Sequence, residues 1–271
     1  MGTGVLSVPV AVAGVWLWGL TGAVWAMAVT AAVQWALTHG AVRAHARRLG
    51  IPIGVRGWSR EQRVLWTFSL PALAQGLMVT PVYWAAAAIL VNQPGGYAEM
   101  GAFSATNQWY AAVLFLPTAL SGAVLPVLSE RVGRGDAAGA RKVLRAAMTL
   151  NLVVVAPIVA VGALASPHIM AMYGAAFGAA WPTLIVVLVT AGLVAVTNPV
   201  GNVLAASNRL WLGFVMNSGW AAVFLGATFV LVKWGALGVA SARLVAYVVH
   251  AVWTLWFAAT FVRARRAAAS A

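Results

Sequence analysis

Residues 181–206 read WPTLIVVLVTAGLVAVTNPVGNVLAA and contain no Asp, Glu, Lys or Arg. A helix of about 20 such residues is long enough to cross the ~30 Å hydrocarbon core of a bilayer. Similar apolar runs recur along the 271 residues, of which 63% are hydrophobic and 8% charged, and this leaves too little polar surface for a soluble globule. The runs do not alternate with a period of two, which favours helices over a barrel. The sequence therefore predicts an all-α integral membrane protein.

About eight membrane-spanning helices are expected. They cover about residues 5–18, 20–42, 64–90, 98–128, 143–164, 181–206, 212–232 and 237–261. A polar segment at residues 43–63, rich in arginine and glycine, separates the first two helices (residues 1–42) from the other six (residues 64–261), and a basic tail follows at residues 262–271. We interpret residues 43–63 as a cytoplasmic linker between two helical lobes. No strong sequence repeat of fixed period is evident.

Two connections carry helix-end signals. Asp136 can cap a helix whose exposed start, residues 137–145, leads into the fifth span. Ser166 and Pro167, with Gly174 after them, have the cap, first-turn proline and terminal glycine of a short surface helix. These signals predict a turn at Asp136 and a separate helix near residues 167–173.

The cationic residues indicate the topology. If the spans alternate in direction, all seventeen Lys and Arg residues except Lys233 and Arg243 fall on one side of the membrane. Because positive residues concentrate in cytoplasmic connections, both termini are expected in the cytoplasm of a multi-pass protein of the bacterial inner membrane. The net charge of +13 is then explained by topology and by anchoring to anionic lipid, and no nucleic-acid partner is predicted. The cations on the predicted cytoplasmic side are Arg43, Arg47, Arg48, Arg56, Arg60, Arg63, Arg131, Arg134, Arg141, Lys142, Arg145, Arg209, Arg263, Arg265 and Arg266.

The residues needed for cysteine chemistry, for metal binding and for the common catalytic motifs are lacking in the sequence. The chain has no cysteine, which excludes disulfides, thiolate nucleophiles and cysteine metal sites. Its four acidic residues are dispersed, and no HExxH, Walker or GxSxG motif occurs. We therefore predict no catalytic residue, no metal site and no cofactor, and we expect the protein not to be an enzyme. The four acids are Glu61, Glu99, Glu130 and Asp136.

Prolines interrupt four neighbouring spans. A proline removes a backbone donor and can bend a helix, and bent helices line the central cavity of many transporters. The alternative is that proline is simply more frequent in membrane helices. The concentration in adjacent spans favours a transporter. The prolines are Pro71, Pro81, Pro117, Pro126, Pro157 and Pro199.

Arg243 is the strongest candidate for a binding residue. An ionisable group inside a span is costly and by default suggests a function. Tyr247 and His250 follow at spacings of four and seven, which puts the three residues within roughly 60° on one helix face. Facing a cavity, Arg243 could bind a diphosphate or an acidic sugar. Alternatively it extends outward to lipid phosphate, and His250 serves as an interhelical hydrogen-bond partner.

Amide and aromatic side chains inside other spans form a second group of candidates. Asn107 and Gln108 offer hydrogen bonds to sugar hydroxyls, and Trp109 offers a face for stacking on a sugar ring. The alternative for the amides is hydrogen bonding between helices. Weaker candidates for the cavity, with the same alternative, are Asn198 and Asn202 in the sixth span and Gln75 and Tyr83 in the third.

A series of short motifs runs from Leu70 to Phe177. In this order they resemble the polysaccharide-biosynthesis flippases, the O-antigen or lipid-linked oligosaccharide exporters of the multidrug/oligosaccharidyl-lipid/polysaccharide (MOP, MATE-like) superfamily. The resemblance covers residues 64–261. The motifs are Leu70-Pro71, Thr80-Pro81-Val82-Tyr83-Trp84, Gly96-Tyr97, Gly101, Phe103, Ala105, Asn107, Gln108, Trp109, Leu116-Pro117, Leu125-Pro126, Ser129-Glu130, Gly135-Asp136, Tyr173-Gly174 and Phe177.

The resemblance implies a MATE-like carboxyl-terminal six-helix lobe, preceded by the last two helices of an amino-terminal lobe. It also implies flipping of a lipid-linked oligosaccharide or polysaccharide precursor from the cytoplasmic to the outer leaflet by alternating access. The implied partners are a polyprenyl-diphosphate-linked glycan, membrane lipid and, in the cell, a polysaccharide polymerase or assembly proteins. Such flippases usually have twelve or more helices, so the resemblance also implies an amino-terminally truncated chain lacking roughly four helices.

Two other functions are compatible with the sequence. A cation-coupled multidrug exporter of the same superfamily would be expected to carry a carboxylate deep in a helix, and none of the predicted spans has one. A structural or assembly subunit of a larger membrane complex would require no transport site at all. The flippase remains the leading hypothesis because bent helices, amides, aromatic residues and Arg243 occur together.

Overall fold

The computed structural model describes residues 2–50 and 62–269, with side chains over residues 8–50 and 62–260. Arg56, Arg60 and Glu61 of the predicted linker lie outside these residues, as do the side chains of the tail arginines at 263, 265 and 266. The described backbone is helical, and it contains no strand. The chain separates into two compact units, Met1–Glu61 and Gln62–Ala271.

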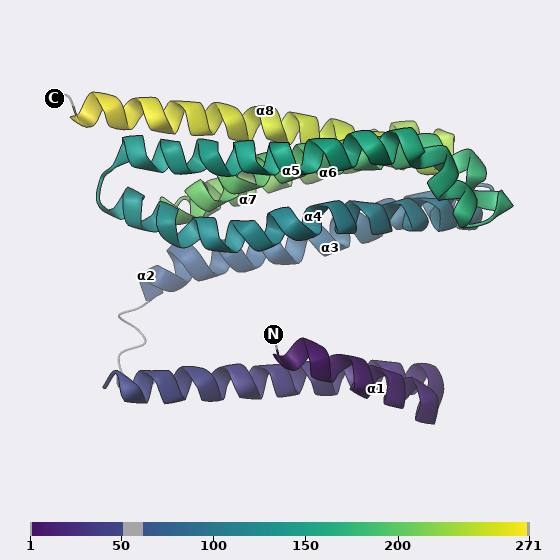
Figure 1. Ribbon diagram of the computed structural model, residues 1–271, viewed down its shortest axis with the longest axis horizontal. Coiled ribbons are helices and arrows are strands. Elements are labelled where there is room, and N and C mark those ends of the chain that lie inside the picture. The colour runs from purple at the N-terminus through teal and green to yellow at the C-terminus, as the bar shows by residue number, and fades with distance from the viewer. Residues whose placement is uncertain (1, 51–61, 270–271) are drawn as a thin grey trace. The chain divides into compact units, whose positions relative to one another are not determined.

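The first unit is a helical hairpin. It consists of α1 (Gly2–Arg48), which is interrupted at Trp18 and Gly19, where Gly19 has φ 57° and ψ −137° (Figure 1). Only glycine adopts this backbone conformation readily, so the chain reverses here. The two arms approach closely, because a Cβ atom on Gly22 would collide with the carbonyl oxygen of Gly14. The break falls between the predicted spans 5–18 and 20–42, while residues 43–48 of the predicted linker continue α1.

The second unit is a bundle of long helices (Figure 1). Their lengths agree with the six spans predicted for residues 64–261, although α4, α5 and α8 extend further than predicted. The elements in order are α2 (Gln62–Val64), a π-helical turn (Leu65–Ser69), α3 (Leu70–Val91), α4 (Gly96–Gly133), α5 (Ala137–Met172), a 3₁₀ helix (Ala175–Ala180), α6 (Trp181–Ala206), α7 (Leu210–Leu231), a 3₁₀ turn (Val232–Trp234) and α8 (Gly235–Ala269).

The separate surface helix predicted near residues 167–173 does not exist, because α5 continues to Met172. Pro167 has no N–H to bond the carbonyl oxygen of Ala163, and this would normally weaken the helix. The hydroxyl of Ser166 donates to that carbonyl oxygen at 2.8 Å instead. The helix therefore passes through the proline without losing the interaction.

Helix α6 is the centre of the second unit and packs against α4, α5, α7 and α8. It is uncharged along its whole length, and its inward residues, including Leu184, Val187 and Ala195, have no exposed surface. Small residues allow close approach, since a Cβ atom on Gly192 would lie 3.3 Å from a methyl group of Val159 on α5. Tight packing around α6 sets the positions of α4 and α8, which carry the candidate binding residues.

A short repeat, missed in the sequence, becomes visible in the structure. Residues 18–22 read WGLTG and residues 234–238 read WGALG. Gly235 has φ 58° and ψ −137°, nearly the same values as Gly19. In both turns the second glycine, Gly22 or Gly238, has no room for a Cβ atom beside a backbone carbonyl oxygen of the preceding segment. The two helical hairpins therefore use the same turn.

By length and composition, six continuous helical segments of the described chain could cross a membrane. Two of the six, Val8–Arg48 and Leu210–Thr260, contain the turns at Gly19 and Gly235 and thus two helices each. The segments agree with the all-α membrane fold and with approximately the number of spans that the sequence predicts.

Candidate functional site

Arg243 on α8 is almost completely buried, with 1% of its surface exposed. Its Nη1 donates a 2.7 Å hydrogen bond to Oδ1 of Asn107 on α4. A charged group in a membrane-spanning helix is costly unless it faces a partner or a cavity, and Asn107 supplies part of the compensation. Because the guanidinium is enclosed, the alternative in which Arg243 extends outward to lipid does not apply to this conformation.

Two aromatic rings of α4 lie beside the same guanidinium. Cζ of Arg243 is 4.3 Å from the centre of the Tyr110 ring and 5.3 Å from that of Phe103. Such cation–π contacts stabilise a cation by about 0.5–2 kcal/mol each. Among the described residues, Nε and Nη2 of Arg243 have no hydrogen-bond partner. These two N–H groups can donate to water or to an anion, and an anion also neutralises the buried charge.

Three tyrosines from three helices meet next to Arg243. The hydroxyls of Tyr83 on α3 and Tyr247 on α8 are 3.0 Å apart, and the Tyr110 hydroxyl interacts with both. Trp220 and Phe224 of α7 pack against the Tyr83 ring at centroid distances of 5.7 and 5.6 Å. The three tyrosine hydroxyl groups therefore form a small polar cluster surrounded by aromatic rings.

A hydrogen-bond network of polar side chains lies further along α8. Gln75 Nε2 on α3 donates to the carbonyl oxygen of Leu210 at 2.9 Å, and Asn217 Nδ2 on α7 donates to Gln75 Oε1 at 3.4 Å. Nε2 of His250 on α8 lies 3.2 Å from Asn217 Oδ1. We call these side chains the Gln75–Asn217–His250 network. It connects α3, α7 and α8.

A cavity of about 280 Å³ adjoins this network. Its polar lining comes from four helices, and its walls include Val194, Leu204 and Met216. The lining thus offers both hydrogen-bond donors and acceptors, which suits a ligand rich in hydroxyl groups. The polar residues that line it are Gln75, Thr197, Asn198, Asn217, Tyr247, His250 and Thr254.

Of the remaining predicted residues, Asn198 lines the cavity, whereas Asn202, Gln108 and Trp109 lie outside it. Asn198 Nδ2 is 3.3 Å from Ser121 Oγ, and Asn202 Nδ2 donates to the Ser121 carbonyl oxygen at 3.3 Å, so both amides connect α6 to α4. Gln108 is exposed on α4. Trp109 packs against a buried cluster around α6, and its Nε1 is buried with no hydrogen-bond partner in the described part of the chain. Asn202, Gln108 and Trp109 are not among the residues that line the cavity.

The structure thus divides the predicted stripe of α8. Tyr247 and His250 line the cavity, whereas Arg243 lies between α8 and α4 with Asn107. Sequence reasoning missed Tyr110, although it follows Asn107 by three residues and so shares its helix face. Asn217 pairs with Gln75 and in doing so orients His250.

The start of α8 is fixed by an acidic residue of α4. Oε2 of Glu99 accepts a 2.7 Å hydrogen bond from the backbone N–H of Ala236. The carboxylate thereby satisfies one of the free donors at the helix amino terminus and interacts favourably with the helix dipole. A Cβ atom on Gly235 would collide with the same carboxylate. Glu99 and Gly235 therefore help to position the helix that carries Arg243 and His250.

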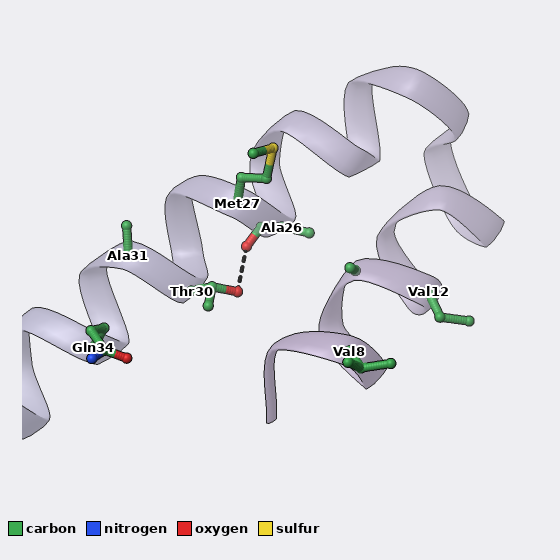
Figure 2. Close-up of a pocket in the computed structure, with 8 residues that line it drawn as sticks. Val8, Val12, Ala26, Met27, Thr30, Ala31 and Gln34 are labelled. Carbon is green, nitrogen blue, oxygen red and sulfur yellow. Dashed lines mark hydrogen bonds between the residues drawn. The ribbon is translucent and has the colours of Figure 1, made fainter. Parts of the chain in front are cut away.

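The hairpin of the first unit contains a groove of a different kind. Its volume is about 530 Å³, and its lining is largely apolar. Figure 2 shows Val8 and Val12 on one arm of α1 and Ala26, Met27, Thr30, Ala31 and Gln34 on the other. The Thr30 hydroxyl is occupied by a 2.7 Å hydrogen bond to the Ala26 carbonyl oxygen. Neither here nor in the second unit do the described residues include three His, Asp or Glu side chains grouped to hold a metal ion.

Comparison with known proteins relates the chain to exporters. No protein-family model matches it. It is 26% identical over 177 residues to the EPS I polysaccharide export inner membrane protein EpsE of Ralstonia nicotianae, and 25% identical over 176 residues to the protein of that name from Ralstonia solanacearum. Each match covers 65% of this chain and 40% of the relative. The matched region is therefore less than half the length of these relatives.

Solved structures with a similar fold are transporters. A MATE structure in the bent conformation has a TM-score of 0.81 at 13% identity, covering 99% of this chain and 62% of the other. The Vibrio cholerae MATE transporter VcmN in its bent form has a TM-score of 0.75 at 15% identity, covering 97% and 61%. A MOP superfamily transporter from Pyrococcus furiosus has a TM-score of 0.62 at 18% identity, covering 72% and 44%. The chain therefore has the fold of MOP/MATE superfamily transporters and is homologous to the polysaccharide export inner membrane protein EpsE.

Proposed function

We propose that this chain is a transporter component that moves a polyprenyl-diphosphate-linked oligosaccharide or polysaccharide precursor from the cytoplasmic to the outer leaflet of a bacterial inner membrane. The observation that carries the proposal is the sequence match to polysaccharide export proteins in a chain with a MATE fold. Homology to EpsE favours a glycan over other cargo. The proposal includes alternating access, in which helices move to open the binding site to each side of the membrane in turn.

Arg243 is the proposed contact for the diphosphate. Its two unpartnered N–H groups can donate to phosphate oxygens, and the nearby tyrosine hydroxyls can add further hydrogen bonds. Because Arg243 is buried in this conformation, the diphosphate reaches it only when α4 and α8 move apart and the Asn107 hydrogen bond breaks. Arg243 therefore becomes accessible to the diphosphate only during part of the transport cycle.

The cavity of about 280 Å³ is the proposed place for part of the glycan. Its amides and hydroxyls, together with the His250 imidazole, can exchange hydrogen bonds with sugar hydroxyl groups. The polyprenyl tail stays in the bilayer, because its transfer from lipid into a polar cavity would be unfavourable. Membrane lipid surrounds the helices, and a polysaccharide polymerase or assembly proteins are the proposed partners in the cell.

The proposed orientation has both termini in the cytoplasm. Helix α4 separates the turn at Gly96 from the turn at Gly135, so reporter tags after these residues should report opposite compartments. The tag after Gly135 should be cytoplasmic, since the turn next to it carries Arg131 and Arg134. Tags that report the same compartment would overturn the proposed topology.

The multidrug exporter remains the second candidate because several similar folds are MATE transporters. At these identities the likeness concerns the fold alone. The described carboxylates, Glu99, Glu130 and Asp136, lie at helix ends, and α3, α6 and α7 have no charged residue. A buried carboxylate that could bind a coupling cation is therefore lacking in the described helices. An assembly subunit without transport activity is the third candidate, and copurification of a stable membrane partner without any effect on glycan export would favour it.

A deletion strain provides the test. Loss of the gene should reduce surface polysaccharide, and the wild-type chain should restore it. The Arg243→Ala variant should fail to restore it at equal abundance, because the cationic contact is lost. The Arg145→Ala variant is the matched control, since Arg145 is an exposed cation at the start of α5. Normal surface polysaccharide in the deletion strain would contradict the proposal, and increased drug sensitivity in its place would favour a multidrug exporter.

A further inference from the structure

In the Gln75–Asn217–His250 network, only one assignment of hydrogen-bond donors and acceptors is consistent. It ends on the Leu210 carbonyl oxygen, which can only accept, so the group of Gln75 that faces it must be the NH₂ group. The oxygen of Gln75 then faces Asn217, whose NH₂ group donates to it. The oxygen of Asn217 must consequently face His250. The Leu210 backbone carbonyl thus fixes the orientation of both amides.

This direction determines the protonation pattern of His250. The oxygen of Asn217 can only accept, so Nε2 of His250 must carry the hydrogen. In the neutral imidazole the lone pair is then on Nδ1, and that nitrogen is the atom that can bind a proton. Binding there leaves the Nε2–H hydrogen bond in place. His250 can therefore gain or lose a proton without breaking the network.

In the described part of the chain, the residues that line the cavity around His250 include no carboxylate. It lines the cavity together with Tyr247, and α3, α6 and α7 bring only uncharged groups to it. Tyr83 and Tyr110 are the titratable groups next to Tyr247, and Arg243 precedes His250 by seven residues, a rise of roughly 10 Å along the helix. Apart from Tyr110 in the middle of α4, the charged or titratable groups of the other two helices in contact with α8 lie towards the helix ends. They are Tyr97, Glu99, Glu130 and Arg131 on α4, and Arg141, Lys142, Arg145 and His168 on α5.

We propose that His250 is the proton-binding residue of the cavity, with Nδ1 accepting a proton from cavity water, and that this proton binds cooperatively with an anionic diphosphate headgroup. The proton site follows from the network and the cavity. The link to the headgroup rests on the proposed export function. An imidazolium would add a second positive charge on the same face of α8 as Arg243. No acidic side chain among the described residues of the cavity lining balances it, and the diphosphate would supply the negative charge. Because linkage is reciprocal, each ligand then strengthens the binding of the other.

The proton site can be measured directly on the full chain in lipid nanodiscs. Histidine labelled at Cε1 gives signals from the four histidines, and the His250→Gln variant identifies the signal of His250. We expect that signal to titrate reversibly as the pH is lowered, with Nε2 protonated throughout. In the Asn217→Leu variant the neutral form should become a mixture of the two tautomers. Asn92→Leu, which replaces an exposed amide at the end of α3, should leave the titration unchanged.

Inorganic diphosphate is the probe for the linkage. We expect it to raise the His250 midpoint by about one pH unit, the low end of the range for an opposite charge near a titrating group, because the diphosphate would lie between Arg243 and His250. A His250 signal that does not titrate at any pH at which the protein stays folded would overturn the proton site. Titration without any effect of diphosphate would overturn the linkage. If both hold while the deletion strain keeps normal surface polysaccharide, the proton site stands and the proposed export function fails.

Discussion

The hydrogen bond between Asn107 and Arg243 offers a quantitative test of the polar core. In Asn107→Leu, the oxygen that accepts the 2.7 Å hydrogen bond from Arg243 Nη1 is removed. Hydrogen bonds to charged groups contribute about 1.5–3 kcal/mol, and this range sets the expected loss. The loss should stay below the ~3–5 kcal/mol typical of a broken buried ion pair, because the Tyr110 and Phe103 rings still contact the guanidinium.

A double-mutant cycle separates this hydrogen bond from other effects of the substitution. Arg243→Met replaces the buried cation by an apolar side chain of similar length, a change that is often close to neutral. In that background Asn107→Leu has no charge left unpaired and should cost less than about 0.5 kcal/mol. The coupling energy between the two positions should therefore be about 1.5–3 kcal/mol.

The free energy of unfolding can be followed by tryptophan fluorescence during titration of detergent micelles with dodecyl sulfate. Gln108→Leu is the matched control. Gln108, like Asn107, is an exposed amide of α4, but its substitution leaves the hydrogen bond of Arg243 in place and should have little effect. Equal costs of Asn107→Leu with and without Arg243 would mean that the two side chains are uncoupled. That result would refute the reasoning about the buried cation.

Two further predictions concern helix ends. Gly235→Ala should lower the free energy of unfolding by about 1–3 kcal/mol, because the positive φ and the Glu99 carboxylate both exclude a Cβ atom, whereas Gly226→Ala, in open space within α7, should be neutral or stabilising. The hydrogen bond from the Gly139 N–H lowers the pKa of Asp136, so the ionised cap stabilises the folded state fully above about pH 4 and loses this effect as the pH falls through the lowered value. The stability difference between wild type and Asp136→Ala should accordingly shrink in acid, as measured by unfolding at pH 7 and pH 3.

For these last variants the outcomes that contradict the reasoning are specific. If Gly235→Ala leaves the free energy of unfolding unchanged, the turn before α8 can relax and Glu99 does not restrict it. A difference for Asp136→Ala that stays constant down to pH 3 would mean that its carboxylate does not cap α5.

Much of the fold follows from local sequence. The uncharged run of α6 predicts its span and its central burial, and Asp136 predicts the turn between α4 and α5, where its side chain accepts from the Gly139 N–H at 2.7 Å. The end of α5 could not be predicted in the same way. Ser166 and Pro167 are typical of a helix start, but the Ser166 hydroxyl bonds to a carbonyl oxygen within the same helix. The sequence pattern does not distinguish these two uses of the same residues.

The candidate site could be predicted only in part. Helical spacing brings Arg243, Tyr247 and His250 to one face of α8, but it does not determine which neighbouring helix meets each residue. Packing of α4 against α8 places Arg243 next to Tyr110, and packing of α7 against α8 places His250 next to Asn217. These contacts between distant segments depend on the arrangement of the whole bundle and leave no local signal.

Reconstitution tests the central claim of glycan translocation most directly. Proteoliposomes containing the purified chain and a fluorescent polyprenyl-diphosphate-linked oligosaccharide are assayed for the fraction of glycan that becomes accessible to an external lectin. The wild-type chain should increase the rate of exposure over empty liposomes, and Arg243→Ala should abolish most of the increase while Arg145→Ala keeps it. A folded wild-type chain that exposes the glycan no faster than empty liposomes would contradict the account.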